Sequence, residues 1–139
     1  MIVAAHTLVY STDPTATRAF FKDVLRWPFV SDAASSDLGA GAAPDDPSGW
    51  LIFATGPSEL GVHPTMPGGR EHPHHTVSLV CDDLDATMVE LTGRGARFRG
   101  APEDRGYGIC VEVEVPGAED LQIYQPRHET AYGLQRLRD

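Results

Sequence analysis

The chain has 139 residues, of which 41% are hydrophobic and 22% charged, with a formal net charge of −9. This length is enough for one compact domain or for two small halves that pack closely together. The negative charge, with no basic stripe to offset it, excludes a nucleic-acid partner, and no segment approaches the ~20 consecutive apolar residues of a membrane span.

The first predicted helix follows a short apolar strand. The segment HTLVYSTDPTATRAFFKDVL begins at His6, and its first five residues have the pattern of a strand. Asp13 followed by Pro14 predicts a helix start, with an N-cap acceptor and a proline at the first helical position. The aromatic and aliphatic side chains of this helix are expected in the core. They are Phe20, Phe21, Val24 and Leu25.

Strand-like segments follow this helix. FVSDA leads into a loop rich in Ala, Ser, Gly and Asp at residues 33–49. WLIFATG and SELGVHP come after the loop, separated by Gly56 and Pro57. Glycine and proline are typical turn residues, so these two segments are predicted to form a hairpin.

The second half repeats the same order. HTVSLVCDDLDATMVELTGRG begins at His75, with Asp83 as the predicted N-cap and Gly93 and Gly95 at the helix end. ARFRG, ICVEVEV and DLQIYQP then read as strands, and a Pro-Gly turn separates the last two. ICVEVEV alternates apolar and acidic residues, as does a strand with one wet face. Its glutamates therefore lie on a solvated face, or one of them serves as a base if that face lines a cleft.

The repeat predicts an α+β fold of two tandem βαβββ modules. The first module covers residues 1–67 and the second residues 74–128, with a linker at 68–73 and a tail at 129–139. A single four-stranded unit would leave an apolar sheet face bare. We therefore expect one compact domain, in which the two modules form an open, barrel-like sheet with a shared cleft.

The two cysteines predict a cytoplasmic protein. Cys81 and Cys110 lie in strand-like segments and form no CxxC pair, which favours reduced core thiols. The N-terminus lacks the charged segment and the long apolar segment of a secretion signal.

The sequence resembles the vicinal oxygen chelate superfamily, which includes glyoxalase I, extradiol dioxygenases, fosfomycin-resistance enzymes and bleomycin-resistance proteins. The resembling motifs are HTLVYSTDPTATRAFFKDVL, VCDDLDAT and PGAEDLQIYQPRH. The resemblance implies a metal ligand near the start of each module's first strand and another in each module's last strand, all facing the cleft. It also implies a homodimer.

The first strands keep only part of this implied ligand set. His6 matches the first place, seven residues before Asp13. In the second module the place falls on Thr76; His75 lies one residue early, and His74 shares the parity of Thr76.

The last strands lack carboxylates at the implied places. The first module has Gly61 there, flanked by Glu59 and His63, and the second has Gln122, whose amide oxygen is uncharged. Loss of side chains that coordinate the metal lowers metal affinity, so a glyoxalase-type centre is not expected.

Three functions remain open. One is a protein that binds a small, neutral or cationic organic molecule in the cleft without chemistry. The second is a metal-dependent lyase, isomerase or dioxygenase, in which His6, His63 and His74 hold zinc, iron, nickel or manganese. The third is a sensing or assembly domain.

Parity with the implied ligand places identifies the candidate cleft-lining residues. They are His6, Glu59, His63, Gln122 and Tyr124. Trp50 and Tyr107 either stack on a flat ligand or pack at the barrel mouth. Arg127 is expected to pair with surface carboxylates, with an anionic substrate as the alternative partner.

Overall fold

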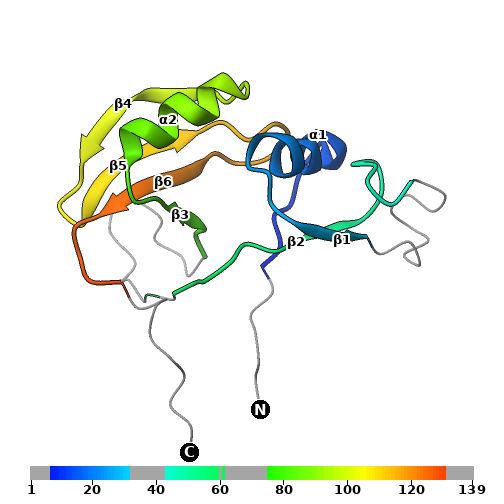
Figure 1. Ribbon diagram of the computed structural model, residues 1–139, viewed down its shortest axis with the longest axis horizontal. Coiled ribbons are helices and arrows are strands. Elements are labelled where there is room, and N and C mark those ends of the chain that lie inside the picture. The colour runs from blue at the N-terminus through cyan, green and yellow to red at the C-terminus, as the bar shows by residue number, and fades with distance from the viewer. Residues whose placement is uncertain (1–6, 32–42, 60, 62–74, 131–139) are drawn as a thin grey trace, which may run out of the picture.

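The computed structural model describes residues 7–31, 43–59, 61 and 75–130 of the chain. This part of the chain has a mixed α+β architecture with two sheets and no closed barrel (Figure 1). The helices are α1 (Pro14–Ala19), its π-helical continuation η1 (Phe20–Val24) and α2 (Leu84–Gly93). The strands are β1 (Phe29–Ser31), β2 (Leu51–Phe53), β3 (Ser78–Val80), β4 (Phe98–Asp104), β5 (Gly108–Val113) and β6 (Leu121–Pro126).

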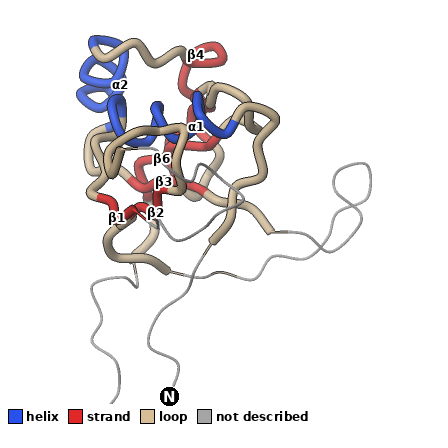
Figure 2. The backbone as a smooth tube through the Cα atoms, turned by 90° about the vertical axis from the view of Figure 1, so that its right-hand side faces the viewer, coloured by secondary structure: helices blue, strands red, loops and turns tan. Residues whose placement is uncertain are grey.

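The second half of the chain forms a four-stranded sheet covered by α2. Its strand order is β3-β6-β5-β4, with β3 parallel to β6 and the other neighbours antiparallel. The order along the chain is β3, α2, β4, β5, β6, so this half has the predicted β-α-β-β-β arrangement. Figures 1 and 2 both place α2 and β4 above the β1–β2 pair.

The first half contains α1, η1 and an antiparallel pair of short strands, β1 and β2. The expected strand at residues 6–10 is not formed by residues 7–10, where Leu8 is 51% and Tyr10 86% exposed. A strand needs a hydrogen-bonded partner, and these residues pair with none within the described ranges. The expected partner segment SELGVHP lies mostly outside those ranges. The tandem repeat of complete modules, with its boundaries, therefore stays a prediction.

Both helices begin as predicted. The side chain of Asp13 accepts a hydrogen bond from the Ala16 amide at 3.1 Å, and Asp83 accepts one from the Ala86 amide at 2.9 Å. These acceptors satisfy amides that have no partner within the helix. The second helix ends at Gly93, and Gly95 follows with a φ of +96°, as the glycine pattern predicted.

One hydrophobic core joins the two halves. It lies between the helices and the α2 side of the four-stranded sheet, where apolar residues alternate along β5 and β6. Phe20 and Phe21 are buried in it, and Val24 and Leu25 pack against it, as expected. Among the described residues, the largest fully buried side chains of this core are Val111, Val113 and Ile123, and Cys110 is equally buried on the other side of the sheet.

The turn before β6 contacts the start of α1 through hydrogen bonds. The Thr12 amide donates to the Gly117 carbonyl at 2.8 Å, and the Thr17 hydroxyl donates to the Pro116 carbonyl at 2.5 Å. Gly117 has a φ of +80°, and a Cβ there would lie 2.7 Å from the Ser11 hydroxyl oxygen. Both facts favour glycine at position 117. The hydrogen bonds of this turn hold the start of α1 against the second half of the chain.

Candidate functional site

The four-stranded sheet presents polar side chains on the side away from α2. Rows of paired residues cross the four strands there, because side chains alternate along each strand. One row is Ser78, Gln122, Glu112 and Arg99, and the next is Val80, Tyr124, Cys110 and Glu103. We call this side of the sheet the polar face; the Cys110 side chain is buried beneath it. Glu112 thus lies beside Gln122 on the polar face. The sequence alone did not decide whether this side of the strand faces solvent or lines a cleft.

Gln122 is held at the centre of the polar face by three side chains. Its Oε1 accepts hydrogen bonds from Arg105 Nη1 at 2.9 Å and from the Tyr107 hydroxyl at 2.8 Å. Its Nε2 donates to the Ser78 hydroxyl at 3.3 Å. The amide is therefore fixed in orientation, with its oxygen toward β5 and its nitrogen toward β3.

Two tyrosines lie beside this amide. The rings of Tyr107 and Tyr124 meet edge to face with centroids 5.5 Å apart. Tyr124 is 8% exposed and Tyr107 45% exposed, so one ring anchors the pair and the other faces solvent. Aromatic pairs of this kind offer a flat ligand both a ring surface and a polar hydroxyl.

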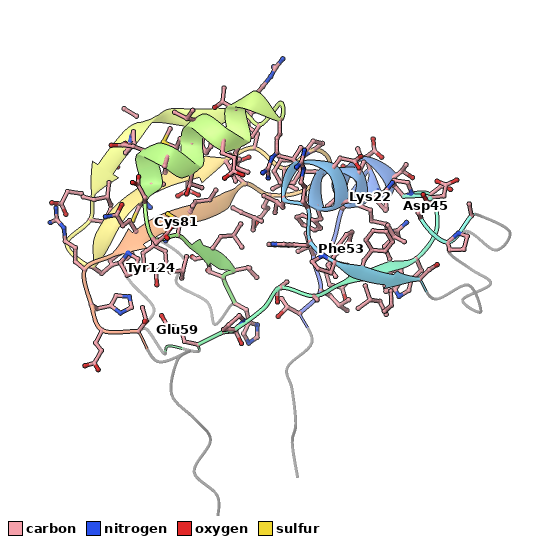
Figure 3. The ribbon with its side chains drawn as sticks, in the orientation of Figure 1. Lys22, Asp45, Phe53, Glu59, Cys81 and Tyr124 are labelled. Carbon is pink, nitrogen blue, oxygen red and sulfur yellow. The ribbon has the colours of Figure 1, made fainter. Side chains whose placement is uncertain are left out.

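The Tyr124 hydroxyl meets groups from two further segments. It lies 3.2 Å from His128 Nε2, while His128 Nδ1 lies 2.8 Å from the Glu129 carbonyl. Since a carbonyl only accepts, Nδ1 donates, and in the neutral ring Nε2 accepts from the tyrosine. The Glu59 carboxylate also reaches this hydroxyl. Figure 3 shows Glu59 below Tyr124, on the segment that follows β2.

Both phenols are proton donors at neutral pH. Burial raises the pKa of Tyr124, and the negative charge of Glu59 raises it further. Burial also raises the pKa of Tyr107, as does its hydrogen bond with the Cys110 thiol, although the bond to Gln122 opposes the shift. Each hydroxyl therefore keeps its proton, because desolvation disfavours the phenolate.

Arg105 reaches over the polar face from the turn between β4 and β5. Its Nη1 lies 3.2 Å from Glu112 Oε1 as well as 2.9 Å from Gln122 Oε1, and its Nη2 lies 3.7 Å from Glu103 Oε2. Arg105 was not among the candidate residues predicted from the sequence, because a turn residue carries no strand periodicity. The only sign in the sequence was its place between two predicted strands, ARFRG and ICVEVEV.

Among the described residues, the polar face and its immediate surroundings carry more acidic than basic groups. The cations on the face are Arg99 and Arg105. Arg127, whose amide donates to the Tyr107 carbonyl, is paired with Asp104. The carboxylates are Glu59, Glu103, Glu112, Glu114 and Asp120. This excess of negative charge favours neutral or cationic molecules over anionic ones.

The predicted site residues divide into two groups. Gln122 and Tyr124 share the polar face, and Glu59 reaches Tyr124. His6, His63 and His74 lie outside the described residues, so the structure does not test the rearranged metal site. Within the described ranges, no group of three or more His, Cys, Asp or Glu side chains is arranged to hold a metal ion.

The implied ligand places that the structure describes do not fit a divalent metal. Gly61 has no side chain, and Thr76 offers an exposed hydroxyl. The Gln122 oxygen already accepts from a guanidinium group, so a metal on that oxygen would face the positive charge of Arg105. The chemistry of these donors therefore differs from the carboxylate and imidazole set of a metal centre.

The other singled-out residues have clear contacts. The Trp50 ring packs under the Arg18 guanidinium, 5.3 Å from the ring centroid, which agrees with the packing interpretation. Arg127 pairs with Asp104 at 2.5 Å, as expected of a surface ion pair. Cys81 and Cys110 are both free, as predicted. Burial raises the pKa of Cys81, so its thiol stays protonated.

A shallow pocket lies elsewhere, where the two halves meet. Its volume is about 430 Å³, and it is mostly open to solvent. Its lining consists of Tyr10, Ser11, Thr12, Gly117, Ala118 and Glu119. Hydrogen bonds between Ser11, Thr12 and Gly117 already use much of this polar lining, so we favour the polar face as the site.

The described helices are all too short, or too polar, to span a lipid bilayer.

Comparison with known proteins places this arrangement in a family. Residues 6–115 match the glyoxalase-like domain, so the chain belongs to this family, within the vicinal oxygen chelate superfamily. No curated protein sequence is significantly similar to the chain.

Two solved structures share the fold. TnmS3, an antibiotic-binding protein from a Streptomyces species, is 21% identical, with a TM-score of 0.55, over 91% of this chain and 98% of its own. A member of the glyoxalase/bleomycin resistance protein/dioxygenase superfamily from Sphaerobacter thermophilus is 19% identical, with a TM-score of 0.52, over 89% of this chain and 98% of its own. At these identities the similarity concerns the fold alone.

Proposed function

We propose that the chain binds a small organic molecule on the polar face, with Glu59, Gln122 and Tyr124 as contact residues. The observation that carries this proposal is the fixed set of Gln122, Tyr107 and Tyr124, in which an oriented amide lies beside two aromatic rings. A site with its polar groups already in place loses less entropy on binding. The antibiotic-binding description of TnmS3 agrees with this class of function.

The ligand is flat, and neutral or cationic. Tyr107 offers an exposed ring for stacking, while the surrounding carboxylates exceed the guanidinium groups. The binding needs no metal, because Gln122 stands where the superfamily implies a charged ligand and its oxygen is engaged by Arg105. His6 and His63 extend the same site in this proposal.

A thermal-shift screen of flat aromatic compounds tests the proposal. Ligand at a hundred times its dissociation constant adds about 2.7 kcal/mol to the free energy of unfolding, which raises the midpoint by several degrees. The stabilisation is expected to be lost in Tyr107→Ala and kept in Tyr10→Ala. Both tyrosines are exposed, but Tyr10 lies in the pocket between the halves. Loss in Tyr10→Ala alone would assign binding to that pocket instead.

The metal-dependent alternative has a separate test. A lyase, isomerase or dioxygenase that used His6, His63 and His74 would hold stoichiometric metal after purification without chelator or histidine tag. We expect none. Bound metal that is lost in His6→Ala would replace the binding-only proposal with the enzyme.

We also propose a homodimer in the cytoplasm. Leu8, Val9 and Tyr10 expose apolar surface on a segment that pairs with no strand in the described part of the chain, and β4 lies at a sheet edge. Exposed edges and apolar segments favour association. Sedimentation at micromolar concentration is expected to give twice the 15.0 kDa chain mass. A single species of the chain mass would contradict the dimer.

A further inference from the structure

Arg105 lies where a ligand of the polar face would bind. Its backbone is fixed by the turn: the Arg105 amide donates to the Gly108 carbonyl at 3.0 Å, and the Gly106 amide donates to Asp104 Oδ1 at 2.9 Å. Gly106 has a φ of +84°, which lets the chain reverse there. From this turn the long side chain folds back across the sheet to Gln122.

The guanidinium group is surrounded by acceptors from three strands. Glu103 comes from β4, Glu112 from β5 and Gln122 from β6. The exposed ring of Tyr107 lies beside this set through its own bond to Gln122 Oε1. A planar cation is the kind of group that such acceptors bind best, since its N–H donors form a flat fork.

The contacts of Arg105 are open to replacement. Its side chain is 39% exposed, and those of Glu112 and Glu103 are 32% and 71% exposed. Ion pairs this exposed are weak, because water competes for both partners and salt screens them. The side chain can therefore leave while the strand-borne acceptors stay in place.

We propose that Arg105 is an internal occupant of the site, and that the ligand carries an amidinium or guanidinium group on an aromatic ring and displaces it. The ligand's cation takes the acceptors of Glu112 and Gln122, and its ring lies against Tyr107. Arg105 thus sets the specificity of the site: it excludes ligands that cannot supply a replacement cation. This inference rests on the proposed function and names its ligand class.

Arg99 provides a matched control. It lies on the same face, in the same row as Gln122, and its removal changes the charge of the face by the same amount. Its partners are Glu114 at 3.2 Å and Asp120 at 2.7 Å, whereas Arg105 bonds to Gln122. A general charge effect would therefore appear in both variants, and displacement of an occupant only in Arg105→Gln.

The experiment measures the binding of benzamidine and of its neutral analogue benzamide to the full chain by titration calorimetry. We expect Arg105→Gln to bind benzamidine about tenfold more tightly than the wild type, and Arg99→Gln to stay within twofold. Adding Glu112→Gln to Arg105→Gln should abolish the gain. Arg105→Lys, which keeps the charge but lacks the planar fork, should lie between wild type and Arg105→Gln. Benzamide should bind all variants equally weakly.

Three outcomes would overturn the inference: no benzamidine binding to either Arg105 variant, weaker binding than wild type, or equal gains in Arg105→Gln and Arg99→Gln. The proposed function fails by a different result. If neutral aromatic compounds bind the wild type and lose affinity in Tyr107→Ala, that function stands even when benzamidine shows no preference. If Tyr107→Ala changes the binding of no compound, that function fails.

Discussion

At the scale of single residues, Gln122 and Ile123 are neighbours in β6 whose side chains lie on opposite sides of the sheet. Ile123 is 2% exposed and packs in the core beneath α2, whereas its neighbour Gln122 points to the polar face and bonds to Ser78, Arg105 and Tyr107. The alternation of a strand makes this division possible. The core side therefore sets stability, and the other side is free to set binding.

The first prediction concerns the core side. Ile123→Ala should lower the free energy of unfolding by about 3 kcal/mol, because it removes buried methylenes and leaves a cavity. Val89→Ala is the control: Val89 is 76% exposed on α2, so its loss should cost less than about 0.5 kcal/mol. Denaturant unfolding of both variants measures the difference. Equal losses would show that β6 does not pack as described.

At the scale of elements, caps and turns determine where helices and strands stop. The N-caps could be predicted from the sequence, because an aspartate before a helical segment has a local function that needs no knowledge of the fold. The parallel pairing of β3 with β6 joins residues 44 positions apart in the Ser78–Gln122 pair, and no local sequence pattern specifies such a pairing. No local sequence pattern predicts that the Arg105 side chain reaches from its turn to Gln122 in β6.

The second prediction concerns the start of α2. Asp83→Ala should cost about 1 kcal/mol of stability, since the Ala86 amide loses its acceptor. Asp82→Ala changes the same charge one residue earlier without removing a cap, so its cost should be smaller. Thermal unfolding followed by circular dichroism compares the two. A larger loss in Asp82→Ala would contradict the assigned helix start.

The third prediction concerns the turn between β4 and β5 at low pH. The Gly106 amide, and to a smaller extent Arg127, lowers the pKa of Asp104 in the folded chain. A lowered folded-state pKa stabilises the fold above the unfolded value, and this contribution is lost as the pH falls through the folded value. The Asp104 contribution should therefore disappear below the ordinary aspartate pKa of 3.8.

The matched variant isolates this contribution. Asp104→Asn cannot titrate, so its thermal midpoint should fall less steeply than that of the wild type as the pH is lowered from 5 to 3, a window set around the ordinary aspartate value. Asp45→Asn removes a carboxyl at the opposite end of the molecule from β4 and β5 (Figure 3) and should follow the wild-type profile. Identical slopes for Asp104→Asn and wild type would show that the turn bond contributes nothing.

At the scale of the whole molecule, the fold joins two halves through one core and one turn. Phe20 and Phe21 from the first half pack with Val111 and Val113 from the second, and the Pro116–Gly117 turn bonds to the start of α1. The α+β class and the superfamily could be predicted from motifs in both halves. The strand expected at residues 6–10 is not formed by residues 7–10: Leu8 and Tyr10 have a strand's composition, but they pair with no strand within the described ranges.

The candidate site was predictable only in part for the same reason. Period-two alternation placed Gln122 and Tyr124 on one face, and the structure has them there. Side chains that arrive from other elements, Glu59 from the segment after β2 and Tyr107 from a turn, depend on tertiary packing. Glu59 was found by its spacing to an implied ligand place, whereas the link between Tyr107 and Gln122 was not foreseen.

The most direct test of the central claim is a map of amide chemical shifts while a compound from the thermal-shift screen is added to labelled protein. Binding on the polar face predicts that the largest changes occur at Ser78, Tyr107, Gln122 and Tyr124. Amides on the outer side of α2, such as that of Val89, should not move. Changes confined to the pocket between the halves, at Tyr10–Thr12 and Gly117–Glu119, would contradict the account.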